Sequence, residues 1–413
     1  MAIPFTLVRS TKVTDFTAMV VFAGLILIAS SAAAQNPPNP DRNANWAMGI
    51  ASANPKLAWS LFEQVTAVNA NGYAEWETWK STGETYLPNG AKPEAWGTPP
   101  PLRILDSDGD GDGDNDGKDD IGNTLSGGVH LTSTAGQNFV DGGLRDLKGR
   151  PIYGEIRLNK TAFEAVVANE LYSVEGQLAM YASGQNFSAP DGSMEVKVTW
   201  RILDDDEDPT LKASYLTSEA IAIVDGVQSS YTLGMTGMNI IFKQDGAWFA
   251  TAFEHIANPF QTLDDLYPHV ALSLRVPAPF VPVNASKQSE YAGSPLGSYF
   301  SVGGQNTFVA SDGGPVFLTN TQQETQIVRT SSCLSCHAYS AIARVDGKPT
   351  RLSPLVTANE DGTATGYFGT PDAAVLDHFT TFDMFWSMIE AQPQNPDNKT
   401  RMITVAEFLA RKK

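Results

Sequence analysis

Two cysteines and a histidine stand together near the C-terminal end of the sequence. Cys333 and Cys336 are the two cysteines of this 413-residue chain, and His337 follows directly, which gives the pattern C-x-x-C-H. This pattern is typical of covalent haem c attachment. Two thiols three positions apart can bond the two vinyl groups on one edge of a porphyrin, and the next imidazole then faces the iron. The motif predicts one covalent haem c with His337 as the proximal iron ligand.

Other uses of a C-x-x-C pair fit this sequence less well. A thioredoxin-like redox pair follows a strand in a βαβ unit and opens a helix. Here the pair follows Thr330-Ser331-Ser332, in a region without a βαβ pattern. A zinc site needs four ligands, and two cysteines with one histidine do not complete it. Haem attachment is the interpretation that the sequence favours.

The N-terminus has the features of a secretory signal peptide. Arg9 and Lys12 precede an apolar run over residues 16–28, and small residues follow up to Ala34. A charged start, an apolar middle and an A-x-A cleavage site are the parts of such a signal. The run is shorter than the ~20 residues of a membrane span, and no later segment is apolar enough to form one. We expect cleavage after Ala34, no stable membrane span, and a periplasmic or secreted protein.

The second axial position of the iron decides between an electron carrier and an enzyme. A histidine or methionine ligand there gives a carrier, whereas an open position gives an enzyme or a gas-binding protein. His255, at the end of an apolar strand, and Met384 or Met388 are the candidates. The sequence favours His255 as this metal ligand, because imidazole binds iron more firmly than a thioether. Alternatively, Glu254 and His255 form the acid–base pair of a peroxidase, or His255 is structural and bonded to a neighbouring carbonyl.

An aspartate-rich run over residues 106–120 is a second candidate metal site. Counted from Asp108, aspartate falls at positions 1, 3, 5, 7, 9 and 12, with glycine at position 6. This is the register of an EF-hand-type calcium loop. The candidate ligands are Asp108, Asp110, Asp112, Asp114, Asp116 and Asp119. The prolines at 99–101 forbid the helix that precedes the loop in a true EF-hand. Two interpretations of this run therefore stay open: a weak calcium site and a solvated acidic linker.

The sequence predicts both helices and strands to position these residues. Residues 56–65, 161–171 and 378–389 place apolar side chains at helical spacing. A C-terminal helix is expected after a capping box formed by Thr404 and Glu407. Residues 194–202 alternate apolar and polar side chains, which predicts a half-buried strand. Two more strands, 238–242 and 248–253, are separated by a hairpin signal at 244–246.

These elements predict an α+β fold. We expect an antiparallel-sheet domain with peripheral helices and a smaller C-terminal helical segment that binds haem c. The expected organisation is a signal peptide (1–34), the α+β domain (35–319, with the acidic loop at 106–120) and the haem c segment (320–413). The net charge of −18 argues against a nucleic-acid partner, because the chain would not neutralise phosphates.

The sequence also resembles exported bacterial proteins described as cytochrome c family proteins. Five short motifs carry the resemblance, at residues 76–79, 169–177, 194–200, 253–256 and 332–337. It implies covalent haem at Cys333 and Cys336 with His337 as proximal ligand, and it implies no substrate.

The function expected from the sequence is one-electron transfer by an exported single-haem c-type cytochrome. Its redox partner protein is not identified by any motif. Two alternatives stay open: a haem-c oxidoreductase of peroxidase type, and a ligand-binding module in which the haem is sensory or structural.

Overall fold

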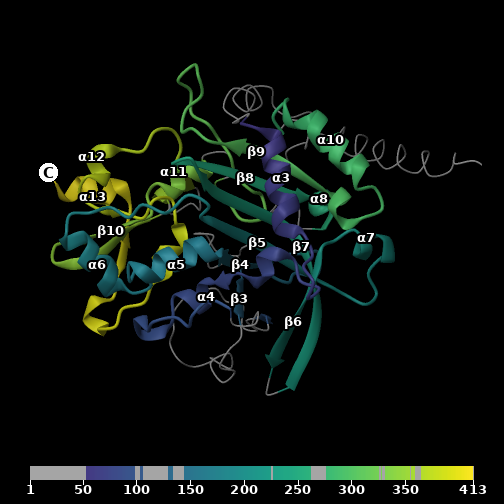
Figure 1. Cartoon of the computed structure of the whole chain (residues 1–413), viewed down its shortest axis with the longest axis horizontal. Coiled ribbons are helices and arrows are strands. Elements are labelled where there is room, and N and C mark those ends of the chain that lie inside the picture. Colours follow the sequence, from purple (N-terminus) through teal and green to yellow (C-terminus); the bar gives the residue numbers. More distant parts are fainter. Residues whose placement is uncertain are drawn as a thin grey trace, which may run out of the picture. The chain divides into compact units, whose positions relative to one another are not determined.

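A large sheet forms the centre of the computed structural model (Figure 1). Nine of the strands among the described residues belong to it, in the order β1-β4-β3-β2-β6-β7-β8-β9, and β5 pairs with β4 and β7. The pairings are antiparallel except those of β2 with β3 and with β6. The strands are β1 (Lys80–Ser81), β2 (Arg103–Leu105), β3 (Val129–Ser133), β4 (Tyr153–Leu158), β5 (Met194–Leu203), β6 (Thr217–Val224), β7 (Val227–Gln244), β8 (Ala247–His255) and β9 (Tyr299–Gln305). The predicted mixed α+β fold is confirmed.

The structure describes residues 53–97, 103–105, 129–133, 144–224, 227–261, 276–324, 327, 331–353, 355–358 and 364–412. All of them fall within one compact unit, residues 46–413. The expected signal peptide and the acidic loop with its six candidate calcium ligands lie outside the described residues. The expected boundary between residues 319 and 320 stays a prediction. In the described part of the chain, no helix has both the length and the apolar character needed to cross a membrane.

Strand β5 forms as the alternation predicts, but it is buried on both faces. Met194, Val196 and Trp200 pack in a hydrophobic cluster with helix α3 (Pro55–Thr66). The polar side chains between them are also covered, and Glu195 and Arg201 are each only 4% exposed. The prediction of a half-buried strand is therefore wrong about burial. Alternation predicts that the two faces of a strand differ in polarity. It does not predict whether other segments of the chain cover the polar face.

The predicted hairpin between β7 and β8 is confirmed. Asp245 and Gly246 form its turn with φ angles of +52° and +75°, and Gln244 pairs with Ala247. Two consecutive left-handed residues are characteristic of the type I′ turn, whose twist matches that of paired strands. The turn aligns β7 and β8 so that both contribute side chains to the candidate site.

Helices cover both faces of the sheet (Figure 1). On α3, Trp59 and Phe62 pack against Phe253 of β8, with ring centroids 5.1 and 4.1 Å apart. The predicted helix at 161–171 appears as α5 (Lys160–Ala168), capped by the Asn159 side chain. The other described α-helices of the first three hundred residues are α4 (Thr82–Thr85), α6 (Val174–Ala182), α7 (Pro209–Ala213), α8 (Asn258–Gln261) and α10 (Phe280–Glu290). The 3-10 helices of this part are η2 (Glu75–Thr78), η3 (Pro88–Gly90) and η6 (Pro295–Ser298).

The C-terminal part of the chain contains strands as well as short helices. A four-stranded sheet has the order β14-β10-β11-β15, and β12 pairs with β13. The strands are β10 (Ala341–Val345), β11 (Lys348–Leu352), β12 (Leu355–Ala358), β13 (Ala364–Gly366), β14 (Thr380–Thr381) and β15 (Arg401–Ile403). The helices are α11 (Cys333–His337), α12 (Ala373–Leu376) and α13 (Val405–Arg411), and α13 begins with the expected capping box. The segment is therefore mixed rather than helical.

The helix predicted at 378–389 does not form. Asp383 and Met384 have φ angles of +48° and +72°, which a right-handed helix cannot contain. The Asp383 carboxylate instead accepts hydrogen bonds from Lys243 Nζ at 2.6 Å and Trp248 Nε1 at 2.9 Å. These tertiary contacts outweigh the helical spacing, and a 3-10 helix, η7 (Trp386–Glu390), follows the interruption.

Candidate functional site

The C-x-x-C-H motif lies on the short helix α11, which is fixed at both ends of its first turn. Cys333 N donates to Leu318 O at 2.9 Å, and Cys336 N donates to Ser332 O at 2.9 Å. The Gln305 side chain accepts a hydrogen bond from Leu334 N at 3.1 Å. Because residues three apart lie on one side of a helix, the two cysteines face the same way.

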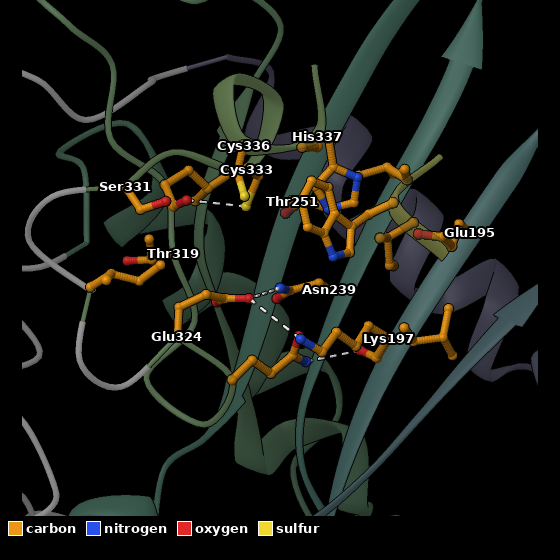
Figure 2. A pocket seen from close by; sticks show the side chains of 18 of the residues that line it. Glu195, Lys197, Asn239, Thr251, Thr319, Glu324, Ser331, Cys333, Cys336 and His337 are labelled. Atoms are coloured by element: carbon orange, nitrogen blue, oxygen red, sulfur yellow. Dashed lines mark hydrogen bonds and ion pairs between the residues drawn. The ribbon is translucent and has the colours of Figure 1, made fainter. Parts of the chain in front are cut away.

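Both cysteines and His337 line one cavity of about 350 Å³ (Figure 2). One wall is the face of the large sheet, where Glu195 and Lys197 of β5 lie beside Ile241 and Asn239 of β7. Residues of the 318–337 segment, of η7 and of β15 form the rest. The sheet residues lie more than eighty positions from the motif, so the fold, and not local sequence, builds this cavity.

The His337 ring is held by one hydrogen bond. Its Nδ1 lies 2.7 Å from the backbone carbonyl oxygen of Met384, and a carbonyl only accepts, so Nδ1 carries the proton. Burial lowers the pKa of His337 to about 4, despite the opposing effect of the Met384 hydrogen bond. The imidazole is therefore neutral, with its lone pair on Nε2. A ligating histidine in proteins usually donates its other ring N–H in this way.

The two cysteine side chains are thiols. Burial raises the pKa of Cys336 to about 12 and that of Cys333 well above its ordinary value, with Glu324 adding to both. The Cys333 thiol donates to Leu318 O at 3.1 Å. Redox-active C-x-x-C pairs have a lowered cysteine pKa, which keeps one sulfur nucleophilic. The electrostatics of this site therefore oppose the alternative of a thioredoxin-like pair.

The donor set and the cavity fit a haem c. Two thiols on one helix face and a neutral, oriented imidazole provide the attachment points and the axial nitrogen. The volume lies within the range of roughly 300–1,000 Å³ of cofactor pockets. Apolar side chains line the space, among them Ile156, Leu318 and Ile389. Lys197 is the one cationic side chain among the described lining residues, and it suits a propionate of the ring.

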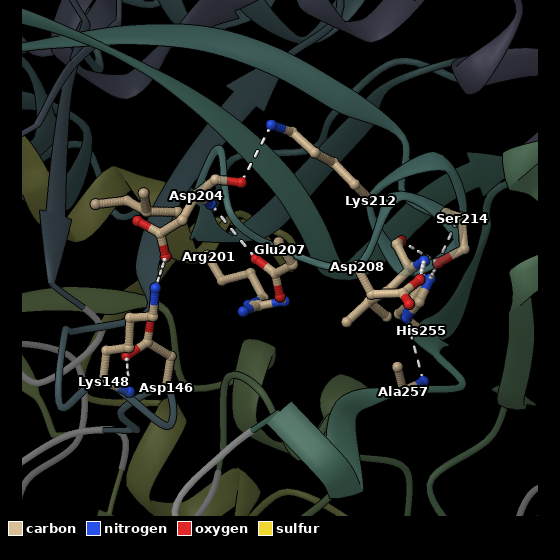
Figure 3. Close-up of polar contacts among 12 residues, drawn as sticks. Asp146, Lys148, Arg201, Asp204, Glu207, Asp208, Lys212, Ser214, His255 and Ala257 are labelled. Carbon is tan, nitrogen blue, oxygen red and sulfur yellow. Dashed lines mark hydrogen bonds and ion pairs between the residues drawn. The ribbon is translucent and has the colours of Figure 1, made fainter.

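His255 does not line this cavity, and Figure 3 shows its polar contacts with Ser214 and Ala257. Its ring stacks on Tyr215 with centroids 3.8 Å apart and is 1% exposed. Nδ1 accepts a hydrogen bond from Ala257 N at 3.2 Å, so Nε2 carries the proton and donates to Ser214 O at 3.1 Å. Burial lowers the pKa of His255 to about 4. The structure does not bring His255 to the cavity, and both of its nitrogens have protein partners.

The other expected groups around the iron are also placed outside the cavity wall. Glu254 accepts hydrogen bonds from the backbone N–H and the hydroxyl of Thr321, at 2.8 and 2.6 Å. Met384 contributes its carbonyl to His337, and the Met388 side chain is fully buried in the hydrophobic core. The methionine that lines the cavity is Met402 of β15.

Three carboxyl groups in the cavity were not foreseen from the sequence. Burial raises the pKa of Glu195 to about 8 and that of Glu390 to about 7, and repulsion between the two adds to the shift of Glu195. Burial also raises the pKa of Glu324, whose Oε1 lies 3.9 Å from Lys197 Nζ (Figure 2). The sequence hinted at Glu195 only through the alternation of polar and apolar residues on β5. A strand face exposed to solvent and a strand face that lines a cavity give the same alternation.

The comparisons with known proteins add no assignment to this geometry. Among the described residues, no cluster of three or more His, Cys, Asp or Glu side chains is arranged to hold a metal ion. The acidic loop lies outside those residues, and its calcium site stays a prediction. The chain matches no protein-family model, no curated protein and no solved structure. Its function is therefore inferred from the cavity and its residues alone.

Proposed function

We propose that this protein is an exported single-haem c-type cytochrome of the cytochrome c family. The haem is attached through Cys333 and Cys336, and His337 is the proximal ligand. The observation that carries the proposal is the common cavity of these three side chains, with His337 Nδ1–H donated to Met384 O so that Nε2 is available. The export signal expected at residues 1–34 agrees with it, because haem c is attached outside the cytoplasm.

The residues of the chain have separable roles in one-electron transfer. A haem c supplies a one-electron ferric/ferrous couple when it is bound. The thiols hold the ring, the Met384 carbonyl holds the His337 imidazole in one orientation, and apolar side chains exclude water from the walls. A rigid cavity without water rearranges little when the haem changes its oxidation state. Electron carriers need this small rearrangement because it keeps electron transfer fast. The partner is a redox protein outside the cytoplasm.

Haem staining after denaturing electrophoresis tests the proposal. The full chain is produced in a host that exports it and attaches haem c, beside Cys333→Ala, Cys336→Ala and the exposed control Glu164→Gln. We expect a haem-stained band for the wild type and for the control, because thioether bonds survive denaturation. Each cysteine variant should lose most of the stain. A colourless wild-type band with normal amounts of exported protein contradicts the proposal.

A second candidate function is supported by the wall of the cavity. In the part of the chain that the structure describes, His337 is the one histidine that lines it, whereas Glu195, Glu324 and Glu390 all do. An iron with an open position beside carboxyl groups is typical of an oxidoreductase. Carbon monoxide added to the reduced protein distinguishes the two functions. No spectral change supports the carrier, and a carbon monoxide complex together with peroxide consumption supports the peroxidase-type enzyme.

A further inference from the structure

Two carboxyl groups, one buried and one partly buried, face the same cavity from elements far apart in the sequence. Glu195 comes from β5 and Glu390 from the end of η7, and both line the space beside Cys336 and His337. Glu195 is 4% exposed, and its Oε2 has no hydrogen-bond partner among the described residues. A buried, unpartnered carboxylate oxygen is costly, so this group needs a proton or a ligand.

The charged groups around the two carboxyls do not neutralise them. Lys197, two residues from Glu195 on β5, forms an ion pair with Glu324 at 3.9 Å. Its charge also lowers the pKa of Glu195 and of Glu390, but by less than burial raises them. Arg351 of β11 donates to the carbonyl oxygens of Met388 and Ala391 and to Gln177 Oε1. Within the described residues, neither Glu195 nor Glu390 forms an ion pair. Two neighbouring carboxylates in a low-dielectric wall cannot both be charged without a large cost.

Neutral hydrogen-bonding groups complete the surroundings. The Ser387 hydroxyl lies 3.2 Å from the Tyr86 hydroxyl. Ser387 lowers the pKa of Glu195 and Thr82 lowers that of Glu390, each by less than burial raises it. Burial raises the pKa of Tyr86 well above its ordinary value, so the phenol stays protonated. The pKa values of about 8 for Glu195 and about 7 for Glu390 have the same cause, burial. Because the two groups repel each other, they titrate as a pair near neutral pH.

We propose that Glu195 and Glu390 form a proton-binding site coupled to the oxidation state of the haem, so that the protein takes up a proton when it is reduced. This inference rests on the proposed haem attachment. An external one-electron donor converts ferric to ferrous iron, and the Glu195–Glu390 pair takes one proton from water. The buried site then gains one negative and one positive charge, and its net charge is unchanged. Proton uptake removes the electrostatic penalty of adding an electron to a low-dielectric cavity.

The reduction potential of the haem-loaded protein as a function of pH tests this coupling. We expect the potential to fall as pH rises between 6 and 9. Full coupling changes the reduction equilibrium tenfold per pH unit, which is about 59 mV for one electron. Glu195→Gln and Glu390→Gln are close in shape to the native residues, and each should flatten the profile. Glu164→Gln, an exposed glutamate on α5, should keep the wild-type profile.

A redox-difference infrared spectrum gives a second readout that does not depend on activity. Reduction should produce the carbonyl band of a protonated carboxyl group, and that band should be lost in Glu195→Gln or in Glu390→Gln. Two independent variants keep the test open if one of them fails to fold. A haem-loaded protein with a flat profile, or with a slope that both variants leave unchanged, overturns this inference alone. A chain without covalent haem overturns the proposed function as well.

Discussion

The Nδ1 atom of His337 lies 2.7 Å from the backbone carbonyl oxygen of Met384, a residue 47 positions further along the chain. Met384 presents this carbonyl from a left-handed backbone conformation, with φ of +72°. The helix break at Asp383 and Met384 is therefore part of what orients the imidazole. The contact joins the C-x-x-C-H motif to the segment that precedes η7.

The methionine side chains near this contact should not bind iron. We expect Met384→Leu and Met388→Leu to keep the wild-type absorption spectrum, because Met384 acts through its backbone and Met388 is buried in the core. Met402→Leu is the methionine variant that can change the spectrum, since Met402 lines the cavity. Spectra of the oxidised and reduced forms check this. Loss of a low-spin signal in Met384→Leu would contradict the assignment of its role.

His255 should make the protein acid-sensitive without affecting the haem. Its folded pKa of about 4 lies below the ordinary 6.5, so the unfolded chain binds more protons between these values. The stability that neutral His255 contributes is complete above pH 6.5 and is lost as pH falls towards 4. The shift corresponds to about 3 kcal/mol.

Urea unfolding of wild type and His255→Gln between pH 4 and 7.5 measures this contribution. The wild type should lose more stability than the variant as pH falls, and the haem spectrum should be the same in both at pH 7.5. The control is His378→Gln, which removes an exposed histidine and should follow the wild type. Parallel pH profiles for wild type and His255→Gln, or a changed haem spectrum, would show that His255 has another role.

A buried ion network should be a major source of stability in the large sheet. Glu155 on β4 accepts from Arg103 Nε at 2.7 Å, from Arg157 Nε at 2.8 Å and from Trp200 Nε1 at 2.9 Å. Removing its charge leaves Arg103 with Glu77 as its remaining ion-pair partner at 2.9 Å and breaks the ion pair of the buried Arg157. Breaking a buried ion pair costs roughly 3–5 kcal/mol. Glu155→Gln should therefore lower the urea midpoint strongly. The exposed Glu164→Gln should stay within about 0.5 kcal/mol of wild type, and equal effects of the two changes would refute the argument.

Calcium should stabilise the protein if residues 108–119 form the expected loop. Six aspartates in this register repel one another unless a cation binds, and binding to the folded state raises stability by mass action. The melting temperature should rise with millimolar calcium, and this rise should be smaller in Asp112→Asn. Asp191→Asn, outside the loop, is the matched control. A melting temperature that calcium does not change in wild type would identify the segment as an acidic linker.

Local patterns predicted the fold well wherever the structure itself is local. The alternation of β5, the turn at Asp245-Gly246 and the capping box of Thr404 and Glu407 all form as expected. The prediction of a helix at 378–389 is wrong, because Asp383 makes contacts with residues about 140 positions away that no local pattern contains.

The residues of the candidate site were also predicted where the pattern is local and missed where distant segments meet. The residues proposed to attach haem, Cys333, Cys336 and His337, lie within five positions, so a local pattern predicts them. The cavity wall comes from β5, β7 and η7, so Glu195 and Lys197 resembled solvent-facing residues of a half-buried strand. His255 followed an apolar strand, as an interior ligand would, but neighbouring strand residues point to opposite faces, and its partners are Ser214 and Ala257.

The mass of the intact exported protein under denaturing conditions shows whether a haem is covalently attached. We expect the mass of the polypeptide from residue 35 to 413 plus one haem, and a peptide in which Cys333 and Cys336 both carry thioether bonds to that haem. A mass equal to the bare polypeptide, from a host that attaches haem to a control cytochrome in the same culture, would show that this chain is not a c-type cytochrome.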